Sequence, residues 1–188
     1  MISKSILCIR HGESTFNAAR VTAGADPLHF DAPMSEVGHQ QVRQARSRLR
    51  EFPVELVIAS PLTRALETAT GLFADHPSTP TILVAALLRE RVENSCDIGR
   101  SPTQLSVDFP SLALAHLADA WWHVDGVPDA RGICVEPIEM VNTRVAEFKT
   151  LLSSRPETFI AVVGHGTFLY HLTGCSLANG EIVELSLA

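Results

Sequence analysis

Two histidines that lie beside glycine are the residues of this chain best suited to chemistry. His11 follows an apolar run at residues 6–9, and His165 follows a second apolar run at residues 158–163. A neutral imidazole is a good nucleophile near pH 7, because its reference pKa is about 6.5. Chance seldom repeats a glycine-flanked histidine at the ends of two apolar runs, so the pair suggests one shared catalytic site.

Two arginines supply the positive charge that such a site needs. Arg10 directly precedes His11, and Arg64 lies in the first turn after a third apolar run at residues 54–59. The guanidinium fork matches phosphate oxygens bidentately, and a charged hydrogen bond contributes roughly 1.5–3 kcal/mol. Covalent catalysis also divides one difficult displacement into two easier ones. These residue types therefore favour phosphoryl transfer.

The elements that must position these residues follow from alternating apolar runs and helical patterns. Such alternation gives a mostly parallel sheet that is covered on both faces. The sequence therefore predicts an α/β fold, a three-layer α/β/α sandwich with a mostly parallel sheet and an antiparallel edge strand, in one domain over residues 1–188. The expected strands are residues 6–9, 54–59, 81–85, 158–163 and 181–187. Four helices are expected at residues 35–50, 102–108, 112–121 and 137–153. A further helix should begin at Pro61 with Ser60 as its cap, and another should follow residues 164–166 and run through Leu172.

In such a sheet, ligands bind beyond the carboxyl ends of the strands. This edge would bring together His11, Arg64 and His165, which are far apart in the sequence. Helix N-termini at the same edge would favour an anion. The glycine after each histidine would let the chain turn sharply and a ligand approach.

Composition narrows the function classes. Fifteen basic and 21 acidic residues give a formal net charge of −6, which does not suit a general binder of nucleic acid or anionic membranes. The N-terminal apolar stretch is too short for a signal peptide, and no stretch approaches the roughly 20 apolar residues of a membrane span. The four cysteines have irregular spacings that fit reduced thiols, so a cytoplasmic location is expected; they are Cys8, Cys96, Cys134 and Cys175. The other histidines show no metal-ligand spacing.

Five segments, in order, resemble motifs of the histidine phosphatase superfamily, in its phosphoglycerate mutase-like branch. They are Arg-His-Gly-Glu-Ser-Thr-Phe-Asn at residues 10–17, Asp-Ala-Pro-Met-Ser-Glu-Val-Gly at 31–38, Ser-Pro-Leu-Thr-Arg-Ala-Leu-Glu-Thr-Ala at 60–69, Leu-Arg-Glu at 88–90 and Gly-His-Gly at 164–166. The resemblance spans nearly the whole chain, from residue 6 to about residue 174. It implies a phosphoric monoester hydrolase of the histidine acid-type class.

The resemblance also implies a role for each matched residue. His11 would attack phosphorus and become phosphohistidine, and Glu90 would protonate the leaving oxygen and then activate water. His165 would complete the catalytic group, and no metal or cofactor would be needed, because the protein's own cations neutralise the phosphoryl charge. The residues implied to hold the substrate are Arg10, Ser14, Asn17, Arg64, His165, Gly166 and Arg91.

The sequence departs from the family pattern in three places. Glu67 replaces a glutamine, and Val-Glu-Pro at residues 135–137 replaces Gly-Glu-Ser, although Glu136 keeps its eight-residue separation from Arg144. Glu93 lies three residues beyond Glu90 in an unusually long segment. Either carboxylate could act as the acid, and we favour Glu90.

Three functions remain open, and hydrolysis is preferred. The short chain and the extra carboxylate favour a phosphatase of a small metabolite over phosphoglycerate mutase-type transfer, and the intact catalytic residues speak against a phosphate-binding regulatory module. Residues 91–134 are expected to cover the substrate, and a homodimer is left open. The residues that could contact the leaving group are Arg91, Asn94, Arg100, Trp121, Trp122 and His123. The tryptophans could stack on a base or sugar, but we favour a structural role for them, with one packed in the core and the other against a helix.

Overall fold

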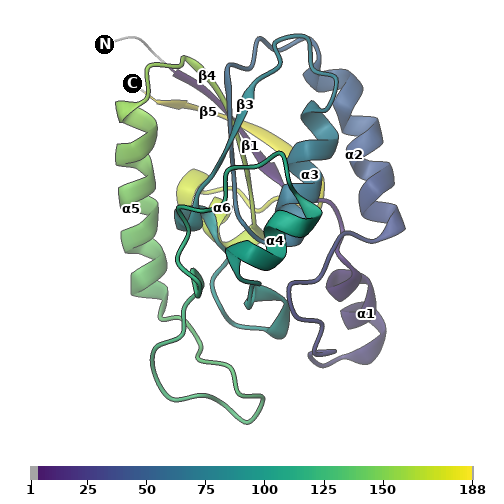
Figure 1. The fold of residues 1–188 in the computed structure, drawn as a ribbon, viewed down its shortest axis with the longest axis vertical. Coiled ribbons are helices and arrows are strands. Elements are labelled where there is room, and N and C mark those ends of the chain that lie inside the picture. Colours follow the sequence, from purple (N-terminus) through teal and green to yellow (C-terminus); the bar gives the residue numbers. More distant parts are fainter. Residues whose placement is uncertain (1–3, 188) are drawn as a thin grey trace.

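The computed structural model describes residues 4–187 and contains a five-stranded sheet at its centre (Figure 1). The strands lie in the order β3-β2-β4-β1-β5, and β1 pairs in parallel with β4 and antiparallel with β5. Ile9, for example, lies opposite Val163 on one side and Ile182 on the other. The α/β prediction with one antiparallel edge strand is thus confirmed. The strands are β1 (Lys4–Arg10), β2 (Leu56–Ala59), β3 (Thr81–Val84), β4 (Phe159–Gly164) and β5 (Ile182–Leu187).

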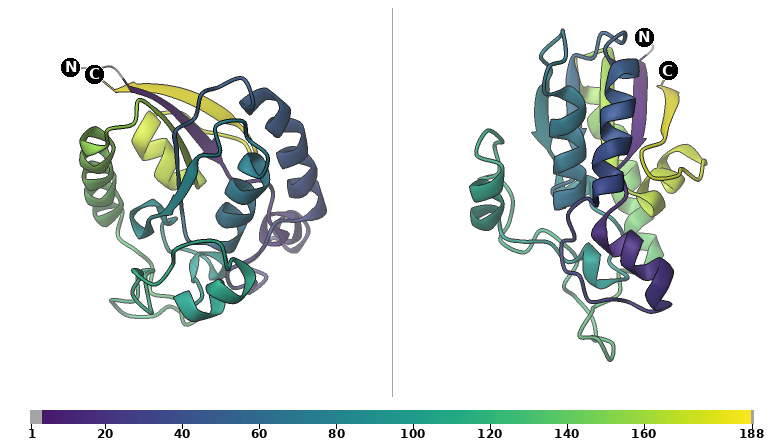
Figure 2. Two further views of the ribbon diagram at one scale, coloured as in Figure 1. Left: turned by 45° about the horizontal axis from the view of Figure 1, so that its top comes forward. Right: turned by 90° about the vertical axis from the view of Figure 1, so that its right-hand side faces the viewer.

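Helices cover the two faces of the sheet, as the apolar alternation of the strands requires. Side chains of odd-numbered positions in β1, such as Leu7, pack with α2 (Glu36–Leu49) and α3 (Thr63–Phe73). Side chains of even-numbered positions, such as Ile6, pack with α5 (Ile138–Ser154) and α6 (Gly166–Thr173). Successive residues of a strand point to opposite faces, so one short strand contributes to two cores. The three layers are visible in Figures 1 and 2.

Most of the predicted elements are present. Ser35 is the N-cap of α2, where its hydroxyl accepts a hydrogen bond from the backbone N–H of Gly38. The helix expected at residues 102–108 is α4 (Pro102–Asp108), which lies to one side of the sheet (Figure 2). None of the helices in the described part of the chain has the length and apolar character of a membrane-spanning segment.

Two local predictions are wrong. Residues 112–121 form turns and bends instead of a helix, because this path lets Leu114 and Trp121 pack in the core cluster that also contains residues of α3. Ser60 does not cap α3, since the helix begins at Thr63 with Leu62 as its N-cap. The sequence analysis also missed three elements, namely α1 (Thr15–Ala23) and the short 3₁₀ helices η1 (Ala86–Leu88) and η2 (Ser95–Asp97).

Candidate active site

A cavity of about 200 Å³ opens beyond the carboxyl ends of the strands. It lies at the lower end of the molecule in Figure 1, where the chain leaves β1 and α1 begins. Charged and polar side chains make up most of its wall. The lining residues are Arg10, His11, Ser14, Phe16, Asn17, Arg20, Arg64, Glu90, Arg91, Glu93, Asn94, Cys96, Asp97 and Thr167.

His11 is buried directly after β1, and its neighbours determine which nitrogen carries the proton. Nδ1 lies 2.7 Å from the carbonyl oxygen of Gly12, which can only accept, so Nδ1 donates. Nε2 therefore holds the lone pair, and it accepts a hydrogen bond from Nε of Arg64 across 3.2 Å. Burial, and then the charge of Arg64, hold the pKa of His11 well below its ordinary value. The imidazole is thus neutral, with a nucleophilic nitrogen turned toward a guanidinium.

The glycines beside the two histidines serve packing more than ligand approach. A Cβ on Gly12 would lie 2.8 Å from the carbonyl oxygen of Gly38, so the tight contact with the start of α2 excludes any side chain. A Cβ on Gly166 would lie 3.4 Å from Cζ of Arg10, which is a close but ordinary contact. Gly166 therefore packs against a phosphate-binding candidate and is not itself part of the cavity wall described above.

Arg64 is held on three sides, in the first turn of α3. Its Nη1 donates to the carbonyl oxygen of Cys96 at 2.5 Å, and its Nη2 donates to Oδ1 of Asp97 at 3.0 Å. Its Nε remains on His11, so the guanidinium plane is fixed relative to the imidazole. A guanidinium has five N–H donors, so two others remain for an incoming anion.

Arg10 is less fully engaged. Its Nη1 donates to the carbonyl oxygen of Leu177 at 2.6 Å. Its Nε is buried and has no hydrogen-bond partner among the described residues. Burial is the main cause that lowers its pKa, and the charge of Glu90 opposes this effect. Such a buried donor is costly to leave unsatisfied, which makes Arg10 ready to bind an anion.

His165 lies behind His11 at the N-cap of α6. Its ring centroid is 5.1 Å from that of His11, and its Nε2 lies 2.7 Å from Oγ of Ser60. The Ser60 hydroxyl, which the sequence suggested as a helix cap, thus orients a histidine. Nδ1 of His165 is buried without a partner in the described residues. Burial lowers the pKa of His165 well below its ordinary value, and the nearby charge of Arg64 acts in the same direction.

Glu90 is placed at the N-terminus of α6. Its carboxylate accepts backbone N–H bonds from Thr167 at 2.9 Å and from Phe168 at 3.2 Å. Burial raises the pKa of Glu90, and the negative charge of Asp97 raises it further. Glu93 also lines the cavity, but its side chain is 54% exposed and its Oε1 lies 3.5 Å from Nη1 of Arg91. The environment therefore suits Glu90 better as a proton donor.

A buried ion pair supports the segment that carries Glu90. Glu136 is fully buried, and its two carboxylate oxygens accept from Nε and Nη2 of Arg144 at 3.0 and 2.8 Å. Nη1 of Arg144 donates to the carbonyl oxygen of Arg89, the residue before Glu90. Glu136 and Arg144, which keep the eight-residue separation of the family pattern, thus form an ion pair that fixes the backbone beside the candidate acid.

Ser14 and Asn17 form the start of α1. The hydroxyl of Ser14 accepts from the backbone N–H of Asn17, and the backbone N–H of Ser14 donates to the side-chain oxygen of Asn17 at 3.1 Å, which completes a capping box. The Ser14 hydroxyl also donates to that oxygen at 2.9 Å. The Ser14 hydroxyl is thus engaged by the helix cap, and Asn17 has its amide nitrogen left to offer a ligand. Asn179, which the sequence analysis missed, donates to the carbonyl oxygen of His11 at 3.1 Å.

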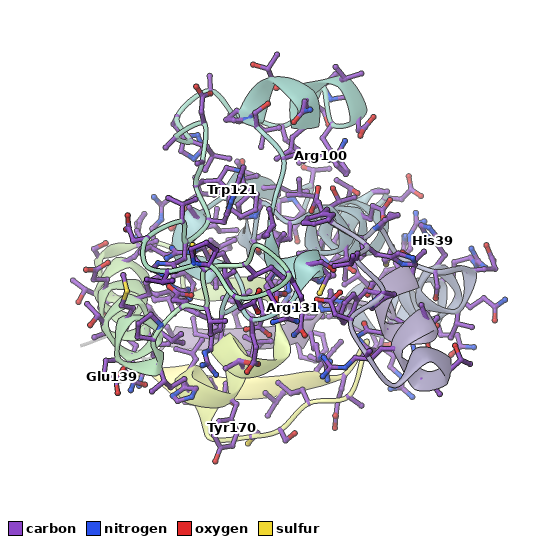
Figure 3. The ribbon with its side chains drawn as sticks, turned by 90° about the horizontal axis from the view of Figure 1, so that it is seen from below. His39, Arg100, Trp121, Arg131, Glu139 and Tyr170 are labelled. Carbon is purple, nitrogen blue, oxygen red and sulfur yellow. The ribbon has the colours of Figure 1, made fainter. Side chains whose placement is uncertain are left out.

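The segment 91–134 divides into parts with different positions. Arg91 and Asn94 line the cavity, and Arg131, from the loop beyond residue 123, donates through Nη2 to the carbonyl oxygen of Glu93, a residue of the cavity wall. Figure 3 shows Arg131 near the middle of this end of the molecule, with Trp121 and Arg100 displaced toward α4. The four other candidates for contacting the leaving group are outside the cavity wall; they are Arg100, Trp121, Trp122 and His123.

Two of these residues have clear structural partners. Arg100 binds Asp31 through Nε at 2.8 Å and Asp108 through Nη1 at 2.7 Å. Trp121 is buried in the core, where its indole N–H donates to the carbonyl oxygen of Arg100 and its ring meets Trp122 edge-on. The core-packing reading of the tryptophan pair is therefore the one that fits.

Asp97, Thr167, Phe16 and Arg20 line the cavity although the sequence analysis did not single them out. No strand end, glycine or helical spacing marks Asp97, because it lies in a short 3₁₀ helix within an irregular segment. Within residues 4–187, no set of three or more histidine, cysteine or acidic side chains is arranged to hold a metal ion.

The fold and this site define a class of protein, and comparison with known proteins agrees with it. A model of the histidine phosphatase superfamily (branch 1) matches residues 6–185, so the chain belongs to that superfamily. A phosphoglycerate mutase-like protein of Arabidopsis thaliana is 30% identical over 96% of this chain and 85% of its own length. A glucosyl-3-phosphoglycerate phosphatase of Mycolicibacterium vanbaalenii is 26% identical over 93% of this chain and 74% of its own length.

Solved structures show the same fold. A mycobacterial hydrolase superposes with a TM-score of 0.64 at 22% identity, over 98% of this chain and 91% of the other. A mycobacterial glucosyl-3-phosphoglycerate phosphatase superposes with a TM-score of 0.60 at 20% identity, over 98% of this chain and 90% of the other. Membership of a superfamily of phosphatases and mutases, with phosphatases among the relatives, supports phosphatase activity in general terms.

Proposed function

We propose that this chain hydrolyses the phosphomonoester of a small metabolite through a phosphohistidine on His11, without a metal. The observation that carries the proposal is the state of His11. Its Nδ1 is committed to the carbonyl oxygen of Gly12, and its Nε2 faces a cavity wall lined by two arginines, Arg10 and Arg64. A neutral imidazole oriented in this way is ready to attack phosphorus.

In the first step, Nε2 of His11 forms a bond to phosphorus as the bond from phosphorus to the leaving oxygen breaks. Glu90 gives its proton to that oxygen, so the leaving group departs as an alcohol. Arg10 and Arg64 would neutralise the charge that develops on the phosphoryl oxygens. His165, which lies behind His11 and has a buried Nδ1 without a partner among the described residues, would add a further contact. The product of this step is a phosphohistidine and an ionised Glu90.

In the second step, water attacks phosphorus and the bond to Nε2 breaks. The ionised Glu90 takes a proton from the water, which restores the acid for the next cycle. The exposed side of the cavity, where Glu93 and Arg20 lie, would admit the water. A mutase must instead keep water out, and an open wall with a second carboxylate favours hydrolysis.

A small substrate fits the size of the site. About 200 Å³ accommodates a phosphoryl group and a modest leaving group, and the polar wall favours a hydrophilic one. All four cysteines are free thiols in the structure. We place the reaction in the cytoplasm, where thiols of this kind stay reduced.

The decisive experiment traps the intermediate. Wild-type protein that is incubated with a labelled phosphomonoester and quenched in alkali should carry an acid-labile label on His11. His11→Ala should lose both the label and turnover, whereas His29→Ala, an exposed histidine, should keep both. Label retained by His11→Ala would reject this nucleophile.

The same preparation tests the metal and mutase alternatives. Hydrolysis of an aryl phosphate should survive excess chelator, and loss of activity that a divalent ion restores would reject the metal-free mechanism. A panel of phosphorylated metabolites, assayed for both free phosphate and isomerised product, separates hydrolysis from mutase transfer and identifies the substrate class.

A further inference from the structure

Asp97 is a buried carboxylate at the cavity wall that the reaction proposed above leaves without a task. Its side chain is 4% exposed, and its Oδ1 lies 3.0 Å from Nη2 of Arg64. Its Oδ2 accepts backbone N–H bonds from Asn94 at 3.0 Å and from Glu93 at 3.3 Å. Both carboxylate oxygens are thus engaged, one by Arg64 and one by the backbone of the loop that carries Asp97.

These contacts fix the direction of the Arg64 guanidinium. Cys96 and Asp97 are adjacent, and together they accept from Nη1 and Nη2, the two terminal nitrogens. The third nitrogen, Nε, is then left on Nε2 of His11 at 3.2 Å. A guanidinium held at both terminal nitrogens cannot rotate away from the imidazole. The position of Nε beside His11 therefore depends on Cys96 and Asp97, which hold the opposite end of the guanidinium.

The charge of Asp97 acts on a second group. Burial is the main cause that raises the pKa of Glu90, and the charge of Asp97 is the next. Burial raises the pKa of Asp97 itself, whereas Arg64 and the backbone amides of Asn94 and Glu93 oppose that rise. The three donors at hydrogen-bond distance favour the ionised form of the Asp97 carboxyl, and it is this form that acts on Glu90.

Other charged groups around Asp97 are themselves paired. Asp26 accepts from Ser95 and binds Nη1 of Arg131 at 3.0 Å, so its charge is compensated. Cys96 is a neutral thiol, because burial raises its pKa, and the neighbouring Asp97 acts in the same direction. Arg10 and His11 face the cavity from the end of β1. Glu90 and Arg64 are therefore the groups on which the charge of Asp97 chiefly acts.

We propose that Asp97 is a positioning residue of the active site, which fixes Arg64 against the nucleophilic nitrogen of His11 and keeps Glu90 in its proton-donating form. The inference rests on the proposed hydrolysis and assigns a task to a residue outside the five motifs of the chain. Asp97 acts through Arg64 and Glu90 and makes no bond to the reacting atoms. It therefore affects rate and pH dependence more than it affects substrate affinity.

The test compares Asp97→Asn with Asp119→Asn, a matched change at an exposed position outside the cavity wall. Asp97→Asn removes the charge and keeps the size. We expect kcat for an alkyl phosphate to fall about a hundredfold, as a misplaced catalytic group costs, with a smaller change in KM. The alkaline limb of the pH profile should move to lower pH, because Glu90 loses its negative neighbour. Unchanged kcat and an unmoved alkaline limb would overturn the proposal.

A longer side chain separates the two tasks. Asp97→Glu keeps the charge but displaces Arg64, so kcat should fall while the alkaline limb stays at its wild-type pH. This variant also serves if Asp97→Asn does not fold, because wild-type kcat in Asp97→Glu would contradict the positioning role by itself.

A readout without turnover separates this inference from the proposed function. Nitrogen NMR of the histidines in the free protein reports the Arg64 contact at Nε2 of His11. That resonance should shift in both Asp97 variants and stay unchanged in Asp119→Asn. If wild-type protein forms no phosphohistidine, the proposed function fails, yet the shift still tests Asp97. An unshifted His11 resonance overturns the inference even where hydrolysis is established.

Discussion

Nε of Arg64 donates a hydrogen bond to Nε2 of His11 across 3.2 Å, so the candidate phosphate-binding arginine and the nucleophile are in contact before any substrate binds. A bond from Nε2 to phosphorus consumes the lone pair that Arg64 holds. The Arg64 N–H is then left beside the phosphoryl group that is bonded to Nε2, where a phosphoryl oxygen can accept it without rotation of the guanidinium, so the positive charge lies where negative charge develops. A donor that is preorganised in this way is most effective in the transition state.

This contact predicts the effect of changing Arg64 to lysine. Arg64→Lys keeps the charge but loses the planar fork, which now reaches His11, Cys96 and Asp97 at once. We expect kcat to fall by about 10² to 10³, the cost of removing a preorganised donor. Steady-state kinetics with an aryl phosphate measures it, with Arg43→Lys on the exposed face of α2 as the control. Equal kcat in the two variants would contradict a fork-dependent role.

The two candidate acids make opposite predictions. Glu90→Gln should slow the reaction of poor leaving groups far more than that of good ones, by up to about 10² to 10⁴ for an alkyl phosphate, because general acid catalysis supplies that range. Glu93→Gln should show no such dependence, since its side chain is 54% exposed and interacts with Arg91. A series of phenyl and alkyl phosphates measures the slope against leaving-group pKa. A steeper slope in Glu93→Gln would transfer the acid role to that residue.

The sequence could predict the site wherever a residue lies at a strand end. His11, Arg64 and His165 were found because apolar runs are visible in the sequence and parallel strands end at one edge. Asp97 could not be found in this way. Its position depends on the path of an irregular segment, which hydrogen bonds to Arg64 and to backbone amides determine after folding.

The tryptophans also lie in an irregular segment, where the sequence alone could not decide between two roles. Trp121 lies in a segment that covers the end of the sheet, so an apolar face in the sequence could equally mean a ligand surface or a core contact. The structure shows the core contact, because the Trp121 ring packs over Gly99, where a Cβ would lie 2.1 Å from the indole. That fit depends on a residue 22 positions away and has no local signal.

The pKa shifts predict an acid-tolerant enzyme. Burial holds the pKa of His11 well below its ordinary value, so the nucleophile stays neutral below pH 6.5, where a free imidazole becomes protonated. Burial raises the pKa of Glu90, so the acid keeps its proton to higher pH than a free carboxyl does. We therefore expect kcat for an alkyl phosphate to remain near its maximum below pH 6.5 and to fall as Glu90 ionises on the alkaline side.

The measurement is the pH profile of kcat, which reports ionisations in the bound complex. Glu90→Gln serves as the control, because it should lose the alkaline limb and keep the acidic side. An acidic limb centred near the ordinary histidine pKa would show that His11 titrates like a free imidazole, and the burial argument would then fail.

The pair of Glu136 and Arg144 predicts a change in stability that also reaches the active site. Arg144→Met removes both donors to a fully buried carboxylate and leaves only Arg89 to neutralise it. Breaking a buried pair in this way costs about 3 kcal/mol of the free energy of unfolding. The change also removes the hydrogen bond to the carbonyl oxygen of Arg89, so Glu90 should be less well placed and kcat should fall. Urea unfolding and steady-state kinetics measure the two effects.

Arg43→Met is the control, because it breaks an exposed pair whose side chains are 60% and 72% exposed, and it should cost less than about 1 kcal/mol. Equal midpoints and slopes for the two variants would show that the buried pair does not support the fold.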